Sequence, residues 1–329
     1  MKTLEEILKA EYVSDIFEKE NLKKQFHEYL KTFHPDLHPG NKAYIEATQK
    51  INILYNRACM LISGGKWEER DTLYVEHKDG KKFVVKYSYK KDFELGSFYV
   101  CRTKIVYLLD KKFKKYYDNF DISRLLKEVH PGLKDSFKEF LPKLKYKFEN
   151  KDNYVVIFDK SYDLIPLSCL LDFYNQKIPD KCSAWIISRL LNLCCFFKIS
   201  GFVQCGIDPE NIFVSPEKHN LVIYGGWWYS KKIGEKLLGI SPFVYSNAPI
   251  YCKTSGLARE DLDLQSVRSI AKKINGWNKI LPKPIQDWEN TGSSVNSVEE
   301  FSRWEKALTA SYGERKFFKS NFDYNKFYK

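Results

Sequence analysis

The chain lacks the patterns that mark metal sites, disulfide frameworks and exported proteins. Its eight cysteines include no C-x-x-C pair, and its histidines do not cluster at zinc-ligand spacing. The N-terminus has no apolar signal core, and the most hydrophobic long window, residues 185–203, contains Arg189, Asn192 and Lys198. We therefore expect a cytoplasmic protein with reduced, mostly buried thiols, no bound metal and no membrane partner.

The composition is typical of a globular protein with two domains. The 329 residues are 43% hydrophobic and 16% aromatic, which is enough for a packed core. The 54 Lys and Arg against 42 Asp and Glu give a net charge of +12, which favours an acidic partner. Such a partner is nucleic acid, an anionic membrane or an acidic patch on a protein, and charge alone does not choose among them.

Two amphipathic helices are predicted within residues 1–63. Their apolar positions recur at helical spacing: Leu22, Phe26, Tyr29 and Phe33 in the first, and Ala47, Ile51, Leu54, Ala58 and Leu61 in the second. Pro35 ends the first helix, and Asn41 is a suitable N-cap for the second. The helices are expected to pack antiparallel and to display His34-Pro35-Asp36 at the exposed tip of their connection.

Residues 1–63 resemble the J-domain of the DnaJ family. The resemblance rests on the basic helix, on His34-Pro35-Asp36, on the Pro-, Gly- and Asn-containing loop, and on the run Lys50-Ile51-Asn52-Ile53-Leu54-Tyr55. In that family the tripeptide and the basic helix dock on a DnaK-type chaperone and accelerate its ATP hydrolysis. The resemblance implies that His34, Pro35 and Asp36 are the trigger. It also implies an electrostatic landing face made of Lys23, Lys24, His27 and Lys31.

An ordinary helical hairpin is the alternative interpretation, in which Pro35 only ends a helix and His34 and His38 are solvated loop residues. The family's usual first helix is loosely matched by residues 4–10, and the Gly-rich and Cys-rich regions of longer DnaJ proteins are absent. Zinc-dependent client binding of that type is therefore not expected.

The residue pattern changes from helical to alternating after Gly64-Gly65, where a second domain, residues 66–329, is expected to begin. Residues 72–77 and 82–87 are predicted strands joined by a hairpin turn. A helix is predicted over residues 98–109 and a buried strand over residues 154–158. From about residue 180 helices dominate. Because strands are predicted in the first part of this domain and helices in the second part, we expect an α+β domain with two lobes.

The second domain resembles the protein-kinase-like fold, with a small lobe at about residues 66–160 and a large lobe at about residues 161–320. Val84-Val85-Lys86 matches the strand lysine that holds the nucleotide phosphates, and Pro209-Glu210-Asn211-Ile212 matches the end of the catalytic loop. A helix beginning near Asp261 and Asp263, with Val267, Ile270 and Ile274 on one face, matches the central helix of the large lobe. The resemblance implies nucleotide binding by Lys86, Asn211 and Asp208, with ATP bound but not turned over.

Departures from the family pattern indicate a pseudokinase with no catalytic residue. The family's His-Arg-Asp becomes Gln204-Cys205-Gly206, and its Asp-Phe-Gly becomes Tyr224-Gly225-Gly226. No G-x-G-x-x-G loop precedes the first hairpin, and the helix predicted over residues 98–109 holds no glutamate, Glu94 lying only at its edge. Phosphoryl transfer needs a positioned acceptor group and phosphates whose charge is neutralised by Mg²⁺. The aspartates of His-Arg-Asp and Asp-Phe-Gly serve these two ends, and both are missing here. Asp208 could replace the base only in a rearranged loop.

Structural alternatives exist for the motifs of the second domain. Lys86 at the end of an apolar strand is commonly a solvated edge residue. Asn211 could brace its own loop by hydrogen bonds. Trp227-Trp228-Tyr229 could fill the former metal site or form a binding surface, and core packing is the favoured interpretation.

Three functions are consistent with the sequence. The first is a co-chaperone whose pseudokinase domain binds a client, a partner or an unreactive nucleotide. The second is an atypical protein kinase or small-molecule phosphotransferase that carries a J-domain. The third is a nucleic-acid-binding protein that uses the net charge and the aromatic and basic runs at residues 111–117 and 316–329. For these runs, solvated lysine-rich surfaces are the favoured interpretation.

Overall fold

The computed structural model describes residues 1–127, 129, 131–175, 177–276, 281–314 and 322–328. The chain divides into two compact units: residues 1–76 with 81–87 form the first, and residues 77–80 with 88–329 form the second. The secondary structure is a mixture of helices and antiparallel strands, so the α+β class expected for the chain beyond its N-terminal helices is confirmed.

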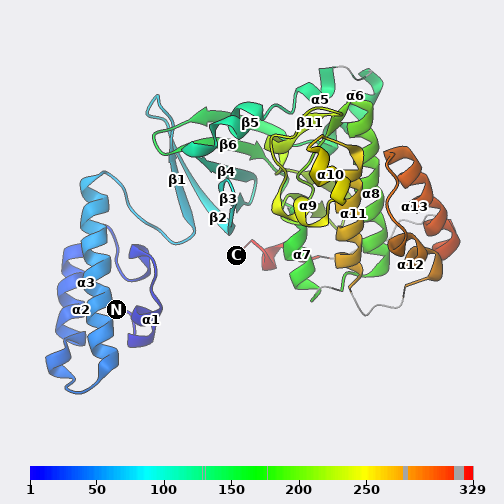
Figure 1. The fold of residues 1–329 in the computed structure, drawn as a ribbon. Coiled ribbons are helices and arrows are strands. Elements are labelled where there is room, and N and C mark those ends of the chain that lie inside the picture. Colours follow the sequence, from blue (N-terminus) through cyan, green and yellow to red (C-terminus); the bar gives the residue numbers. More distant parts are fainter. Residues whose placement is uncertain (128, 130, 176, 277–280, 315–321, 329) are drawn as a thin grey trace. The chain divides into compact units, whose positions relative to one another are not determined.

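The first unit is built on two long helices, α2 (Leu22–Phe33) and α3 (Lys42–Ser63), which lie side by side and antiparallel (Figure 1). The short α1 (Leu4–Lys9) packs on α3, and one-turn 3₁₀ segments occupy Val13–Asp15 and Pro35–Leu37. The predicted apolar stripes are buried, except that Phe26 and Leu61 are half-buried. Asn41 caps α3, its Oδ1 accepting the Ala43 N–H at 3.1 Å. Both predicted helices are therefore confirmed.

Aromatic rings fill the centre of the first unit. Phe26 stacks on Tyr55 with a centroid distance of 3.8 Å, and Phe17 meets Tyr29 edge-on at 5.8 Å. Trp67, from the segment that follows α3, is also buried in this cluster. A fully buried aromatic side chain contributes about 1.5–3 kcal/mol by leaving water, so the cluster stabilises the packing of α2 on α3.

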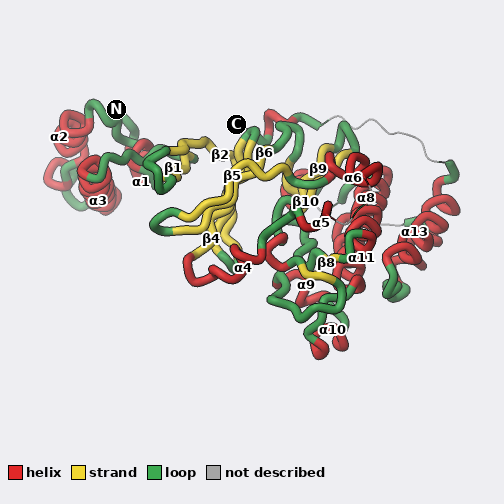
Figure 2. Tube along the Cα trace, turned by 90° about the horizontal axis from the view of Figure 1, so that it is seen from above, coloured by secondary structure: helices red, strands yellow, loops and turns green. Residues whose placement is uncertain are grey.

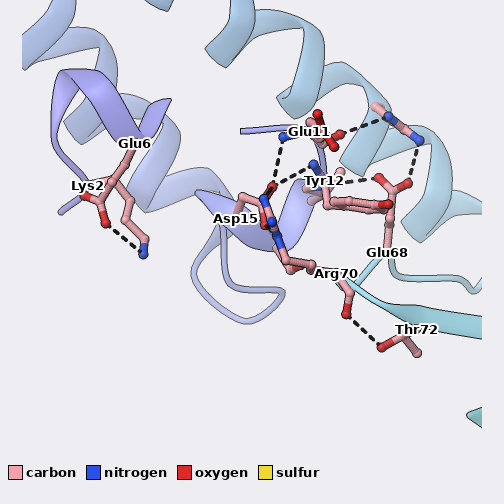
Figure 3. A network of polar contacts seen from close by, with 11 residues as sticks. Lys2, Glu6, Glu11, Tyr12, Asp15, Glu68, Arg70 and Thr72 are labelled. Carbon is pink, nitrogen blue, oxygen red and sulfur yellow. Dashed lines mark hydrogen bonds and ion pairs between the residues drawn. The ribbon is translucent and has the colours of Figure 1, made fainter. Parts of the chain in front are cut away.

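A polar network ties the segment after α3 to the 3₁₀ turn at Val13–Asp15 (Figure 3). Asp15 accepts two hydrogen bonds from the Arg70 guanidinium and two from the backbone N–H groups of Glu11 and Tyr12. Glu68 pairs with Arg57 of α3 at 2.5 Å. The residues that leave α3 are thus held on the helical unit rather than extending freely from it.

The strand β1 (Thr72–Glu76) pairs antiparallel with the first part of β2 (Lys82–Phe93), Thr72 opposite Lys86 and Glu76 opposite Lys82. The hairpin predicted from residues 72–87 is confirmed. In the second unit an antiparallel sheet follows the order β2, β3 (Gly96–Cys101), β4 (Lys104–Asp110), β6 (Asn153–Asp159), β5 (Lys143–Glu149) (Figure 1). Figure 2 shows the strands in yellow. The strand predicted at residues 154–158 is the buried β6.

The helix predicted over residues 98–109 is wrong, because these residues form β3 and β4. Phe98 lies opposite Tyr107 in the antiparallel register, and only Arg102 and Thr103 separate the two strands. The segment is rich in aromatic and β-branched residues, which favour strands, but no Gly, Pro or Asn marks its turn. It therefore has the appearance of one long apolar run in the sequence. Glu94 consequently lies in the turn between β2 and β3, and not at the edge of a helix.

Four helices pack together in the second unit: α8 (Asp180–Ile199), α11 (Glu260–Asn275), α12 (Lys283–Asn290) and α13 (Ser297–Tyr312) (Figure 1). Ile186, Leu190, Leu193 and Phe197 of α8 are all buried, as are Val267, Ile270 and Ile274 of α11. The helix predicted with Val267, Ile270 and Ile274 on one face is confirmed, and α8 agrees with the expectation that helices dominate after residue 180. The remaining elements are α4 (Lys114–Asn119), α5 (Arg124–Lys127), α6 (Pro131–Phe137), β7 (Ile165–Pro166), α7 (Leu167–Phe173), β8 (Phe202–Val203), β9 (Ile212–Ser215), β10 (Asn220–Ile223), β11 (Lys231–Lys232), α9 (Pro242–Asn247) and α10 (Ile250–Ser255), with further one-turn 3₁₀ segments at Lys111–Phe113, Lys138–Phe140, Trp227–Tyr229 and Tyr324–Lys326.

Within the described residues, α8 is the helix with the length and apolar content of a membrane span, although 56% of its apolar window is buried inside the unit. A core helix meets the same criteria.

Trp227, Trp228 and Tyr229 are buried, so the core-packing interpretation is confirmed for them. None of the eight cysteines forms a disulfide, and five are buried. In the described part of the chain, no three His, Cys, Asp or Glu residues converge on a possible metal position.

Candidate functional site

The candidate site of the first unit is the connection between α2 and α3. His34-Pro35-Asp36 lies directly after the last residue of α2, and its two ionisable side chains face solvent. The exposed fraction is 48% for the His34 side chain and 86% for the Asp36 carboxylate. Leu37, the next residue, is 61% exposed. The tripeptide therefore stands at an accessible tip, as the sequence predicts.

Local hydrogen bonds shape this tip into a single 3₁₀ turn. His34 Nδ1 accepts the Asp36 N–H at 3.3 Å, and the Leu37 N–H donates to the His34 carbonyl at 3.0 Å. Pro35 begins the turn, where its fixed φ and missing N–H cost nothing. The Asp36 carboxylate thus projects from a backbone with little freedom to rearrange.

The base of the tip is fixed to both helices. His38 stacks on Tyr44 of α3 with a centroid distance of 3.6 Å, and its Nε2 lies 3.0 Å from the Thr32 carbonyl of α2. The Thr48 hydroxyl of α3 donates to the Phe33 carbonyl at 2.7 Å. These bonds satisfy carbonyls at the end of α2 that have no partner within the helix. The tip is therefore exposed at its end and rigid at its root.

One face of α2 is basic and unpaired. Lys23, Lys24, His27 and Lys31 are all exposed, and none of them makes an ion pair with another described residue. Glu28 is the single acidic residue of this helix. The opposite face carries the buried Leu22, Tyr29 and Phe33, so packing fixes which way the basic face points. An acidic partner could approach this face without first breaking an internal salt bridge.

The second candidate site is the loop between β8 and β9, where Asp208 and Asn211 come together. Asp208 Oδ1 accepts the backbone N–H groups of Glu210 and Asn211 at 2.9 and 3.0 Å. Its Oδ2 accepts from Asn211 Nδ2 at 2.9 Å, and the same Nδ2 donates to the Gly206 carbonyl at 2.8 Å. Burial raises the pKa of Asp208 to about 7, although its backbone hydrogen bonds oppose this shift. Both side chains therefore brace their own loop.

Three glycines beside this loop leave no room for side chains. A Cβ on Gly206 would lie 2.7 Å from the Gly226 Cα, and a Cβ on Gly225 would lie 1.8 Å from Asn211 Oδ1. Gly226 also has φ of +77°, a conformation that glycine adopts readily. The backbone at residues 206 and 226 is in direct contact. Neither position has space for a carboxylate.

Aromatic rings occupy the space next to this loop. Trp228 stacks on Phe93 of β2 at 5.3 Å and meets Tyr107 of β4 edge-on at 5.0 Å. Phe98 of β3 stacks on Tyr107 at 5.3 Å. Burial raises the pKa of Tyr107 well above its usual value, so its hydroxyl stays neutral. The side chain that reaches Gly225 from the sheet is thus a neutral tyrosine.

Lys86, the predicted phosphate-binding lysine, is exposed on the first part of β2 and belongs to the first unit. Asp208 and Asn211 belong to the second unit. The structure therefore brings together two of the three predicted nucleotide-binding residues. Residues 316–321 and 329 of the second predicted basic run lie outside the described residues.

Sequence reasoning missed the two carboxylates that position the loop. Asp263 of α11 accepts the backbone N–H groups of Gln204 and Cys205 at 2.7 and 2.8 Å, and burial raises its pKa to about 7. Glu210 accepts hydrogen bonds from Tyr89 of β2 at 3.0 Å and from Ser168 of α7 at 2.8 Å. The only signal for Asp263 in the sequence is an acidic residue near the start of a predicted helix. This signal does not identify the backbone groups that the carboxylate holds.

No protein-family model matches the chain, and no curated protein sequence matches it. The functional assignment therefore depends on the geometry of the two candidate sites.

Proposed function

We propose that the first unit is a J-domain that recruits a DnaK-type chaperone and stimulates its ATPase. The observation that carries the proposal is the exposed His34-Pro35-Asp36 turn at the end of an antiparallel helix pair. A site that acts on another protein's ATPase needs a side chain presented in one fixed geometry. The stacking of Tyr44 on His38 and the hydrogen bond from the Thr48 hydroxyl hold the root of this turn and supply that rigidity.

The basic face of α2 supports the same proposal. Its four exposed groups increase the rate of encounter with an acidic surface and set the register of docking, while each contributes little affinity. Tip and face are consecutive in the chain, because α2 ends at Phe33 and the tripeptide begins at His34. One partner could therefore contact both at once.

The second unit is proposed to be a degenerate kinase-like domain that binds a client, a partner or a nucleotide without catalysing phosphoryl transfer. Support comes from the two positions of the family's carboxylates. Gly206, at the place of the catalytic aspartate, has no space for a side chain, and Tyr224 stands at the place of the metal-binding aspartate. Asp208, the candidate replacement base, is occupied by three hydrogen bonds within its loop. An atypical kinase or phosphotransferase would need both arrangements to change.

The test is a single-turnover ATPase assay of a DnaK-type chaperone with the full-length protein and with its His34→Gln variant. The wild type should accelerate hydrolysis, and His34→Gln should lose at least about tenfold of the acceleration while keeping the wild-type thermal melt. His77→Gln, at a histidine outside the tip, is the matched control and should stimulate normally. Full stimulation by His34→Gln would refute the proposal.

A further inference from the structure

A pocket of about 260 Å³ lies on the second unit between α8 and the segment that ends α6. It is lined by Phe137, Phe140, Arg189, Asn192 and Leu193. None of these residues belongs to the tip or to the loop at residues 204–211. The pocket is slightly smaller than the ~300–1,000 Å³ typical of drug-sized ligands, so its ligand must be small.

Arg189 supplies a positioned cation in this pocket. Its guanidinium lies over the Phe140 ring, 4.7 Å from the centroid, and its Nε–H donates to the His219 carbonyl at 3.4 Å. Nη1 and Nη2 make no hydrogen bond to any described residue. The stacking and the single bond orient the guanidinium but leave its two-pronged end available for a planar anion.

Arg189 differs from comparable arginines in the described part of the chain. Three arginines there are buried or half-buried: Arg124, Arg189 and Arg268. Arg268 pairs with Glu300 at 2.5 Å and Arg124 lies 3.9 Å from Asp121. Arg189 alone of these has no carboxylate partner. A half-buried charge without a counter-ion is costly, so an external anion would be favoured here.

The other residues that line the pocket indicate the chemistry of the rest of the ligand. Asn192 lies three residues after Arg189 on the same face of α8, and its side-chain amide also has no described partner. Phe137, which stacks on Phe196 at 4.3 Å, and the buried Leu193 form an apolar surface. We propose that this pocket binds a small apolar carboxylate, with the carboxylate on Arg189 and Asn192 and the apolar portion against Phe137 and Leu193.

The experiment titrates the full-length protein with 4-phenylbutyrate and, separately, with the uncharged 4-phenylbutan-1-ol, using calorimetry. The carboxylate should bind saturably, and the alcohol at least about tenfold more weakly, because only the carboxylate accepts charge-assisted hydrogen bonds from the guanidinium. Arg189→Gln should weaken carboxylate binding by a similar factor. Arg102→Gln, at an exposed arginine in the turn between β3 and β4, is the matched control and should not change it.

Equal binding of the acid and the alcohol, or unchanged carboxylate binding by a folded Arg189→Gln variant, would overturn the proposal. Absence of saturable binding by the wild type at millimolar carboxylate would also overturn it. The comparison of acid with alcohol uses the wild type only, so it remains decisive even if the variant does not fold. A thermal melt shows whether the variant is folded. The result is independent of chaperone stimulation, which the tip governs.

Discussion

Arg70 and Asp15 form a two-point ion pair, with Nε 2.8 Å from Oδ1 and Nη2 2.9 Å from Oδ2 (Figure 3). The pair joins residues 55 positions apart and holds the chain that leaves α3 against the turn that precedes α2. Asp15 is the more buried partner, with 12% of its side chain exposed. Because Trp67 lies in the same segment and is buried in the aromatic cluster, charge and packing act together at this point.

The pair predicts an acid-dependent stability of the first unit. Partial burial raises the pKa of Asp15, but Arg70 and the N–H groups of Tyr12 and Glu11 outweigh it and lower the pKa to about 2. A lowered folded-state pKa gives stability that is present above the ordinary value of 3.8 and is lost as pH falls toward 2. Asp15→Asn should cost about 1 kcal/mol at pH 7 and flatten this acid dependence.

Hydrogen exchange of the α3 amides as a function of pH measures this effect within the first unit. Asp36→Asn, at the exposed tip, is the matched control and should follow the wild type. The assignment fails if Asp15→Asn loses protection in parallel with the wild type between pH 4 and pH 2.

The basic face of α2 should govern encounter with the chaperone and not the stimulated rate. Lys24→Glu should raise the protein concentration for half-maximal ATPase stimulation several-fold, leave the maximal rate unchanged, and lose this difference as salt is added. Lys66→Glu, an exposed lysine after α3, is the matched control. An effect of Lys24→Glu on the maximal rate alone would contradict the division of roles between face and tip.

Gly225→Ala should be strongly destabilising. The new Cβ would lie 1.8 Å from Asn211 Oδ1, and Asn211 cannot withdraw without releasing the Gly206 carbonyl and Asp208. A cost of about 2–4 kcal/mol in the free energy of unfolding is expected from overpacking combined with lost buried hydrogen bonds. Gly292→Ala, where an added Cβ has no neighbour within 4 Å, is the control for urea denaturation. Similar losses in both variants would refute the steric account.

Tyr328→Phe should destabilise the second unit by about 1–2 kcal/mol. The Tyr328 hydroxyl donates to the Leu164 carbonyl at 2.7 Å and accepts from Lys160 Nζ at 2.5 Å. Lys160 is buried, and burial lowers its pKa to about 7, so loss of any partner is costly. Urea denaturation measures the change, with Tyr162→Phe at an exposed tyrosine as control. No difference between the two variants would show that the C-terminal contact adds no stability.

Sequence reasoning succeeded where one local pattern determines the structure. The spacing of Leu22, Tyr29 and Phe33 and the cap at Asn41 define α2 and α3 without reference to the rest of the chain, and Pro35 places the tip between them. It failed at residues 98–109, because strand and helix cannot be told apart in an apolar run whose turn has no marker residue. The same error placed Glu94 at the edge of a helix, whereas it lies in the turn between β2 and β3.

Contacts between distant segments could not be predicted at all. Asp263 holds the backbone of Gln204 and Cys205 from 58 or more positions away, and nothing at either end specifies the other. The same holds for Tyr107 beside Gly225, and for the pocket around Arg189. These relationships exist only once the sheet and helices of the second unit have packed, so they are properties of the tertiary structure and not of any window of sequence.

The close approach of Gly206 and Gly226 joins two chain segments at a point where neither position has space for a side chain. A side chain introduced at residue 206 would overlap the chain at residue 226, and one introduced at residue 225 would overlap Asn211. Each such substitution therefore requires the loop to shift. Two chain segments would have to separate first, so any replacement at residue 206 is expected to require a compensating change in the path of the chain at residue 226.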